Sequence, residues 1–399
     1  MMGHPSSEKT KTILFINLYS AMGGGEYALY NLLKHLDRSR FRPVMMFNER
    51  GEFARRVESL GIETVVLPYQ VMMLRELVHP ARFAQMLKSS RQIAHYLKQD
   101  PAELIHCSDV LSLMFIAIPV IRFKIPVVYS VIFFYEWTRI LLFNLLAIIL
   151  VDKIIANSSA VRKHLQARTL FLSGRMEVVY QGVDTSEFRP SRNGERDLLR
   201  GELGLSGATR LVGMVGRFDP QKGHIIFLEA AAQVIQRSRD VRFVVIGGAL
   251  FSDVFPFYKQ YQDDVMECHR RLGLGSHVTF LPQRDDIPEV MRSLDLFVLP
   301  STQEGFGLVV LEALASGVPV VVSDAAGAVE VVGTIPSVYV AETGKPGSFA
   351  EKILHALDDI ELRAGVPTGG SSVPAVSPDI TALDWGGYAD KMENLYATA

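Results

Sequence analysis

Residues 301–321 read STQEGFGLVVLEALASGVPVV, and they predict one complete strand–turn–helix–strand unit together with their flanks. The stretch follows a mostly apolar run, LDLFVLP (294–300), and continues into another, GVPVVVS (317–323). Short apolar runs bounded by turn residues are typical of strands buried on both faces of a parallel sheet. Between the runs, VVLEALASG has the composition of a helix that ends at Gly317. The turn EGFG therefore joins a strand to a helix.

The same alternation recurs along the chain in two series. Stretches long enough for helices separate the strand-like runs, and alternating strands and helices predict a doubly wound α/β fold. We therefore expect two Rossmann-like domains, each built on a parallel sheet, facing each other across a ligand-binding cleft. The further runs lie at 12–18, 42–48, 64–68, 103–108, 126–134 and 152–158 in the first series, and at 211–218, 241–248 and 277–282 in the second.

Length and linker composition set the expected domain boundaries. A chain of 399 residues allows two ordinary domains. The polar segment at 181–197, with Gly and Pro, is typical of a linker. We expect an N-terminal domain over 1–180 and a C-terminal domain over 198–365. Residues 366–399 are expected to form a flexible loop and a terminal helix that returns to the N-terminal domain.

Composition and charge restrict the class of protein. A hydrophobic fraction of 48% and a charged fraction of 21% are those of a globular protein with a core. The only cysteines, Cys107 and Cys268, are far apart, so we expect no disulfide framework or zinc cluster, and a cytoplasmic location fits. Residues 1–180 carry 22 Lys and Arg against 14 Asp and Glu, whereas residues 181–399 carry 19 against 29. The opposite charges suggest different partners for the two halves.

Two segments of the first half suggest contact with a membrane. Residues 74–98 are rich in Lys and Arg with apolar residues between them, which is typical either of a solvated helix face or of contact with an anionic surface. The run ILLFNLLAIILV (140–151) has 12 residues, short of the roughly 20 that span a bilayer, and predicts a core or surface-docking helix. Together they favour a membrane-associated acceptor on the cytoplasmic face. No nucleic-acid partner is expected.

The predicted turn EGFG lies at the carboxyl end of a parallel strand, where open α/β sheets bind ligands. A helix N-terminus attracts an anion such as phosphate, and glycines let the backbone approach that ligand. The residues whose backbone N–H groups would open this helix are Gly305, Phe306, Gly307 and Leu308.

Two carboxylates flank this helix start. Glu304, just before the helix, would point into the cleft. Glu312 would lie about two turns further along and would be either paired internally or held ready to accept hydrogen bonds from the vicinal hydroxyls of a ribose. An E-x7-E spacing is common by chance, so the alternative of a helix-start residue and a solvated residue stays open at this point.

A second motif carries two cations. GRFDPQKG (216–223) follows the strand LVGMV directly, so Arg217 and Lys222 would lie at the same sheet edge as Glu304. Two cations aimed at a diphosphate would stabilise the charge on a departing nucleotide, as a metal ion otherwise does. The sequence contains no Asp-x-Asp triplet, so no metal site and no cofactor are expected.

These motifs resemble those of the retaining GT-B glycosyltransferases with an E-x7-E motif, the glycosyl transferases group 1 or sucrose-synthase-like family. The resemblance rests on GRFDPQKG, FLPQRDDIPEVMRSLDLFVLPS, EGFGLVVLEALASGVPVVVSD and AGAVEVV within residues 211–331. GGGE (23–26) is similar to the GGxE turn after the first strand, and VYQGVDTSEFRP is similar to the interdomain segment. The resemblance implies retaining transfer of a hexosyl-type group from a nucleotide-diphosphate sugar to a glycan or lipid-linked acceptor.

The resemblance also implies roles for single residues. Glu304, Arg217 and Lys222 are implied in catalysis, the two cations on the diphosphate and the glutamate on the hydroxyls of the donor sugar. Glu312 is implied on the ribose. The remaining implied donor contacts are Gly24 and Gly25 in the first domain, Arg284 near the base, and the helix start from Gly305 to Val309. Candidates on the acceptor side are Glu26 and His106.

The sequence departs from the family pattern at two positions. Ile132 stands where members often carry a cleft histidine, and Gln181 stands where NGVD is usual. One alternative is therefore a nucleotide-sugar-binding relative without transfer activity. A nicotinamide-dependent dehydrogenase is the other alternative, but GGGE lacks the G-x-G-x-x-G spacing, and Glu49 is a weak ribose-binding candidate.

Overall fold

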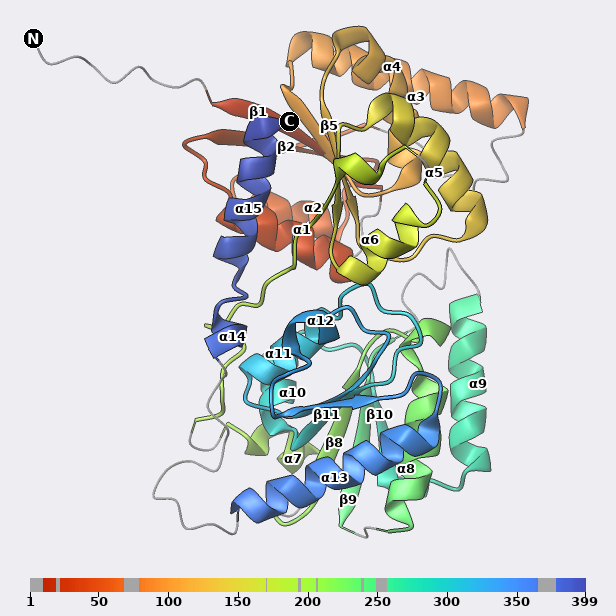
Figure 1. The fold of residues 1–399 in the computed structure, drawn as a ribbon, viewed down its shortest axis with the longest axis vertical. Helices are drawn as coiled ribbons and strands as arrows, with labels where there is room; N and C mark the ends of the chain where they lie inside the picture. Colours follow the sequence, from red (N-terminus) through yellow and green to blue (C-terminus); the bar gives the residue numbers. More distant parts are fainter. Residues whose placement is uncertain are drawn as a thin grey trace, which may run out of the picture. The chain divides into compact units, whose positions relative to one another are not determined.

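The chain folds into two compact units (Figure 1). The first comprises Met1–Gln181 and Trp385–Ala399, and the second comprises Gly182–Asp384. Most of the predicted loop before the terminal helix, and residues 74–78 of the basic segment, lie outside the described residues. The computed structural model describes residues 10–18, 22–67, 79–169, 171–192, 195–205, 207–237, 240–248, 257–364 and 378–399.

The first unit contains a seven-stranded parallel sheet in the order β3-β2-β1-β4-β5-β6-β7. The apolar runs form its strands because they are buried on both faces: in β1, the five residues after Lys11 are all buried. Side chains alternate between the faces, so Leu14 packs in one core and Phe15 contacts Tyr396 on the opposite side. The strands are β1 (Lys11–Ile16), β2 (Phe41–Phe47), β3 (Glu63–Val66), β4 (Leu104–Cys107), β5 (Val127–Val131), β6 (Lys153–Ala156) and β7 (Met176–Val178).

Helices cover both faces of this sheet. α1 packs against α2 and against the C-terminal helix α15, while α3 packs on α4 and α4 on α5. α6 contributes Val161 and Leu165 to the same core as α3, α4 and α5. The bounds are α1 (Gly24–His35), α2 (Glu52–Ser59), α3 (Pro80–Gln99), α4 (Val110–Phe123), α5 (Trp137–Leu150), α6 (Ser159–Gln166), the 3-10 turn η2 (Ser173–Arg175) and α15 (Trp385–Thr398).

The second unit contains a six-stranded parallel sheet in the order β10-β9-β8-β11-β12-β13. α8 packs against α9 and α13, whereas α10 packs against α7 and α11. The strands are β8 (Arg210–Val215), β9 (Val241–Ile246), β10 (Val278–Leu281), β11 (Leu296–Leu299), β12 (Val320–Ser323) and β13 (Val338–Ala341). The helices are α7 (Asp197–Glu202), η3 (Pro220–Lys222), α8 (His224–Ile235), α9 (Phe257–Arg271), η4 (Gly275–His277), α10 (Ile287–Ser293), α11 (Leu308–Ala315), α12 (Val329–Val332), α13 (Pro346–Ala364) and α14 (Pro378–Thr381).

The predicted fold class of two doubly wound parallel-sheet domains is confirmed, and the strand–turn–helix–strand unit is β11, α11 and β12. The helix α11 ends where expected, since Gly317 has a φ of +75°. Two strands, β7 and β13, were not predicted from the sequence. Both are edge strands of three or four residues, too short for a clear period.

The two segments with suspected membrane contact both form helices, α3 and α5. Within the described residues, no helix combines the length and the apolar character needed to cross a membrane.

Candidate functional site

The EGFG turn is held in place at the carboxyl end of β11. Gly307 caps α11 with a φ of +97°, a backbone conformation that residues with a Cβ rarely adopt. The neighbouring segment supports the turn, because Gly327 N–H donates to the carbonyl of Glu304 and Ala328 N–H donates to that of Phe306. The start of α11 therefore has a fixed conformation at the ligand-binding edge of the sheet.

The two motifs predicted to share this edge are joined through their backbones. The amide of Thr302 donates to the carbonyl of Gln221 at 2.8 Å. Gly223 has a φ of +75°, and a Cβ at this position would lie 2.1 Å from the carbonyl oxygen of Pro300. Only glycine allows this close approach, so the loop 216–223 packs directly beside the loop that carries Glu304.

Glu304 and Lys222 form an ion pair at this junction. Lys222 Nζ lies 2.5 Å from Glu304 Oε2, and the hydroxyl of Ser301 donates to the same oxygen at 3.2 Å. The glutamate side chain is 13% exposed and the lysine 24%, so both are shielded but reachable. A charge-assisted contact of this length fixes both side chains at the entry to α11. Sequence analysis did not single out Ser301, which is the first residue of the stretch quoted at the outset.

Arg217 has a different partner. Its Nε and Nη2 donate to Oδ2 of Asp219 at 3.1 and 2.8 Å, and its guanidinium lies over the ring of Tyr258, 5.5 Å from the centroid. Asp219 is buried, and its other oxygen accepts the amide of Gln221 at 2.9 Å. Asp219 therefore both orients Arg217 and starts the turn that leads to Lys222. It was missed in the sequence, although it lies between the two cations in one motif.

Glu312 lies in α11 and is buried, with only 8% of its surface exposed. Within the described part of the chain, no cation or hydrogen-bond donor contacts its carboxyl group. Burial, and next the nearby charge of Glu187, raise the pKa of Glu312 to about 8. A buried carboxyl group without a partner is costly and is ready to bind a hydroxyl-bearing ligand.

Arg284 lies on the loop after β10 and is held by two acidic residues. It makes paired hydrogen bonds to Asp286 at 2.7 Å and to Glu202 at 2.9 Å. These carboxylates raise the pKa of Arg284 above its usual value. Neither partner belongs to the Lys222–Glu304 pair, so the structure does not bring Arg284 into direct contact with that pair.

The residues predicted in the first unit lie at the start of α1. The helix begins at Gly24, inside the GGGE sequence, and Glu26 accepts the amide of Gly23 at 3.1 Å as part of its N-terminal cap. A Cβ on Gly25 would lie 2.4 Å from Cδ1 of Ile132. The glycine therefore permits contact with the isoleucine that replaces the expected cleft histidine.

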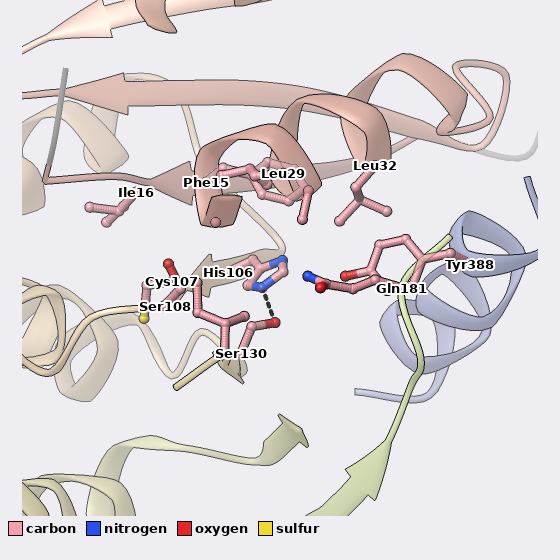
Figure 2. A pocket seen from close by; sticks show the side chains of 13 residues that line it. Phe15, Ile16, Leu29, Leu32, His106, Cys107, Ser108, Ser130, Gln181 and Tyr388 are labelled. Atoms are coloured by element: carbon pink, nitrogen blue, oxygen red, sulfur yellow. Dashed lines mark hydrogen bonds between the residues drawn. The ribbon is translucent and has the colours of Figure 1, made fainter. Parts of the chain in front are cut away.

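His106 lines a small cavity in this unit (Figure 2). Its Nδ1 lies 2.6 Å from the hydroxyl of Tyr396 and its Nε2 lies 2.8 Å from Oγ of Ser130, so both ring nitrogens have partners. Burial lowers the pKa of His106 to about 3, which keeps the ring neutral. The space open to the centre of a water molecule in this cavity measures about 30 Å³.

The cavity also brings together both departures from the family pattern. Ile132 and Gln181 line it, and Figure 2 shows Gln181 and Tyr388 beside His106, across from Leu29 and Leu32 of α1. The acceptor-side roles suggested for Glu26 and His106 stay predictions. The residues that line the cavity are Phe15, Ile16, Gly25, Ala28, Leu29, Leu32, His106, Cys107, Ser108, Ser130, Ile132, Gln181 and Tyr388.

Among the residues that the structure describes, no set of three or more His, Cys, Asp or Glu side chains is arranged to hold a metal ion. The groups described at the entry to α11 are Lys222, Glu304 and the helix N-terminus, with Arg217 on the adjoining loop and Glu312 inside the helix.

Two family models match the chain. The model of the glycosyl transferases group 1 matches residues 195–366, and that of glycosyltransferase family 4 matches residues 22–187. Each half of the chain thus matches a glycosyltransferase model, and these matches support the predicted assignment to the group 1 glycosyltransferases. Neither match supports the dehydrogenase alternative.

Curated relatives and solved structures agree with this assignment. A D-inositol 3-phosphate glycosyltransferase of Segniliparus rotundus is 33% identical over 226 residues, which are 55% of this chain and 48% of the relative. One from Rhodococcus erythropolis is 37% identical over 180 residues, 44% of this chain and 39% of the relative. In these matches the chain spans about half of the relatives' length or less.

Among solved structures, Anabaena Alr3699/HepE in complex with UDP-glucose has a TM-score of 0.80 and 25% identity, covering 97% of this chain and all of that one. WaaG, a glycosyltransferase involved in lipopolysaccharide biosynthesis, has a TM-score of 0.71 at 16% identity, again covering 97% of this chain and all of the other. These likenesses confirm the predicted GT-B fold.

Proposed function

We propose that the protein is a retaining glycosyltransferase that moves a hexosyl-type group from a nucleotide-diphosphate sugar. The observation that carries the proposal is the Lys222–Glu304 pair at the entry to α11. The buried carboxyl group of Glu312, which has no partner among the described residues, lies further along the same helix. A helix N-terminus, a cation and a carboxyl group free to accept hydroxyls are the groups that a phosphorylated, ribose-bearing donor requires. The match to the model of the glycosyl transferases group 1 supports the same chemistry.

The proposed step is a front-face displacement. The bond between the sugar's anomeric carbon and the diphosphate oxygen breaks, and that carbon forms a bond to the acceptor hydroxyl oxygen on the same face. The acceptor's proton passes to the departing diphosphate oxygen, so no protein base is needed. Lys222 and Arg217 stabilise the negative charge that grows on the diphosphate, and Glu304 positions the sugar through its hydroxyls.

The donor we propose to test first is UDP-glucose. Alr3699/HepE was solved with UDP-glucose, and it is similar to this chain over nearly the whole length of both. Glu312 would accept the ribose hydroxyls, Arg284 would lie near the base, and the backbone from Gly305 to Val309 would meet sugar and phosphate. We propose that no divalent metal takes part, because the two cations supply the neutralising charge.

The acceptor we propose is a glycan or lipid-linked intermediate, such as a precursor of a surface polysaccharide, on the cytoplasmic face of a membrane. The excess of Lys and Arg in residues 1–180 supports this proposal. An inositol phosphate is a second acceptor class, since the matched curated relatives are named D-inositol 3-phosphate glycosyltransferases.

A nucleotide-sugar-binding protein without transfer activity is the second candidate. Ile132, in the place of the expected cleft histidine, favours it, and so does the small size of the cavity that Ile132 lines with His106 and Gln181. This candidate binds the donor and leaves it intact.

The experiment compares binding and turnover on the purified full chain. A thermal-shift screen with UDP-, GDP-, ADP- and TDP-sugars identifies the donor, because a ligand that binds only the folded state raises the melting temperature. Donor hydrolysis and transfer are then followed by NMR of the anomeric proton. Retained configuration supports the proposal, inverted configuration refutes the mechanism, and binding without any turnover supports the second candidate.

A further inference from the structure

The helix α5 has an apolar face that the fold leaves uncovered. Ile140, Phe143, Ala147 and Leu150 point into the core and are buried. The opposite face would be polar in an ordinary surface helix, but here it is made of leucine and isoleucine. Its exposed residues, at the i, i+4, i+7 and i+8 positions of one stripe, are Leu141 (73% exposed), Leu145 (64%), Ile148 (43%) and Ile149 (67%).

A second exposed apolar side chain lies on a loop tied to this helix. Phe171 is 76% exposed. The loop is fixed on both sides of it, because Asn144 donates to the carbonyl of Arg168 at 2.8 Å and Arg175 donates to the carbonyl of Val151 at 2.5 Å. We call Leu141, Leu145, Ile148, Ile149 and Phe171 the apolar patch.

The helices that share one layer with α5 carry basic side chains and no acidic ones within their own bounds. The sequences of α3, α4, α5 and α6 contain no Asp or Glu, whereas α1 and α2, which do not belong to this layer, contain Glu26, Glu52 and Glu58. The exposed cations on or directly after these four helices are Lys88, Arg91, Lys98, Arg122, Lys124, Arg139 and Lys163, against acidic residues at the helix ends that include Asp100, Glu136 and Asp152.

We propose that this face of the first unit, the apolar patch with its surrounding cations, binds the surface of an anionic lipid bilayer. An uncovered apolar stripe among Lys and Arg is the pattern of an element that lies in the headgroup region with its apolar side chains reaching the acyl boundary. The 14 residues of α5 extend about 21 Å, less than the bilayer core, so the helix would lie along the membrane and not across it. A second copy of the chain fits less well, because two such faces would bring cations against cations.

The proposal gives the membrane-associated acceptor of the proposed function a location on the protein. It rests on that function only for its biological purpose, since lipid binding requires neither donor nor turnover. The two can therefore fail separately: vesicle binding tests this surface, and donor binding tests the site at α11.

The test is flotation of the full chain with vesicles of equal parts phosphatidylcholine and phosphatidylglycerol. We expect binding at low salt that weakens steeply as salt is added, since charges are screened over about 8–10 Å at physiological ionic strength. Leu145→Gln with Ile149→Gln should weaken binding about tenfold or more, because two side chains lose their apolar burial. Lys88→Glu with Arg91→Glu should weaken it through charge alone.

Leu362→Gln is the matched control, because Leu362 is 70% exposed and lies on α13 of the second unit. It should leave flotation unchanged, and thermal melts should show that all variants fold. Absence of wild-type flotation at low salt overturns the proposal, as does binding that both double variants retain. If the wild type instead forms a dimer that Leu145→Gln with Ile149→Gln dissociates, and does not float, the face is an interface between copies of the chain.

Discussion

Lys222 Nζ lies 2.5 Å from Glu304 Oε2, so the cation assigned to the donor's diphosphate is already neutralised by a carboxylate of the same site. Arg217 is paired in the same way with Asp219. In the proposed function, an arriving diphosphate would compete with these carboxylates, and the hydroxyls of the donor sugar would replace Lys222 as partners of Glu304. The pair would thus link phosphate binding to sugar binding.

Glu304→Gln should separate these two roles. The variant frees Lys222 from its ion pair, so UDP alone should bind more tightly than to the wild type. The same change removes a contact used in the transition state, so kcat should fall with only a modest change in donor KM. Calorimetry with UDP and initial rates with the donor sugar measure the two effects. Glu351→Gln, at an exposed position of the second unit, is the control, and weaker UDP binding by Glu304→Gln would contradict the competition.

Lys222→Ala or Arg217→Ala should lower kcat/KM. The corresponding rise in the activation free energy should be about 2.7–4 kcal/mol, the usual cost of removing one preorganised electrostatic group. Turnover should not require a divalent metal. If EDTA abolishes activity and Mg²⁺ restores it, the two-cation account is wrong.

Asp219→Asn should lower kcat/KM through Arg217. Hydrogen bonds to charged groups contribute about 1.5–3 kcal/mol, so we expect a loss near that size. If Asp219 acts by positioning Arg217, the substitution should have almost no further effect in an Arg217→Ala background. Additive losses in the double variant would instead assign Asp219 to the stability of the loop, which thermal melts would reveal.

Glu312→Gln should change the pH dependence of stability. The pKa of Glu312 is about 8 in the folded chain, against 4.5 in its ordinary environment. The folded state therefore holds this proton more tightly than the unfolded state. The protonated carboxyl group of Glu312 therefore contributes to the stability of the folded state. This contribution is complete below pH 4.5 and is lost as the pH rises through 8. The glutamine variant lacks this loss, so its stability relative to the wild type should rise across that window, reaching on the order of a few kcal/mol.

Urea titrations at several pH values measure this difference, and a pH-independent difference would exclude a raised pKa. Donor binding gives a second readout. Ribose hydroxyls that donate to the carboxylate favour its charged form, so binding below pH 8 should release a proton. Calorimetry in buffers of different ionisation enthalpy detects that proton, and Glu312→Gln should abolish its release while chiefly raising donor KM.

Gly25→Ala should destabilise the first unit, because its new methyl group would lie 2.4 Å from Cδ1 of Ile132. Overpacking of this kind costs about 1–3 kcal/mol. Ile132→Val removes the opposing carbon atom, so alanine at position 25 should be tolerated better in that background. Equal destabilisation in both backgrounds, measured by chemical unfolding, would show that the contact with Ile132 is not the cause.

The strand runs and the two loop motifs were predictable because each is a local pattern. LDLFVLP needed only its own apolar residues to indicate β11, and Gly307 and Gly317 marked the two ends of α11. The short edge strands β7 and β13 were not predictable in this way. Three or four residues carry too little periodicity, and each strand is defined only by its pairing with the preceding strand, β6 or β12.

The partners of the charged and polar side chains could not be predicted from the sequence either. Lys222 and Glu304 are 82 residues apart, and His106 and Tyr396 are 290 apart. The motif around Arg217 indicated a cation but not that Asp219 would hold it, because side-chain direction follows from the fold of the loop. Likewise, the run 140–151 indicated an apolar helix, but only packing decided which of its faces stayed exposed.

The sequence by itself determined the fold class, the order of strands and helices apart from the edge strands β7 and β13, and the family motifs, because these depend on residue types at short, regular spacings. Tertiary structure decided that Lys222 is paired with Glu304, that Glu312 is buried with no partner among the described residues, and that both nitrogens of His106 have partners. Charge, protonation and accessibility depend on which distant groups surround a side chain. Those surroundings exist only once the sheet has brought the loops at its carboxyl edge together.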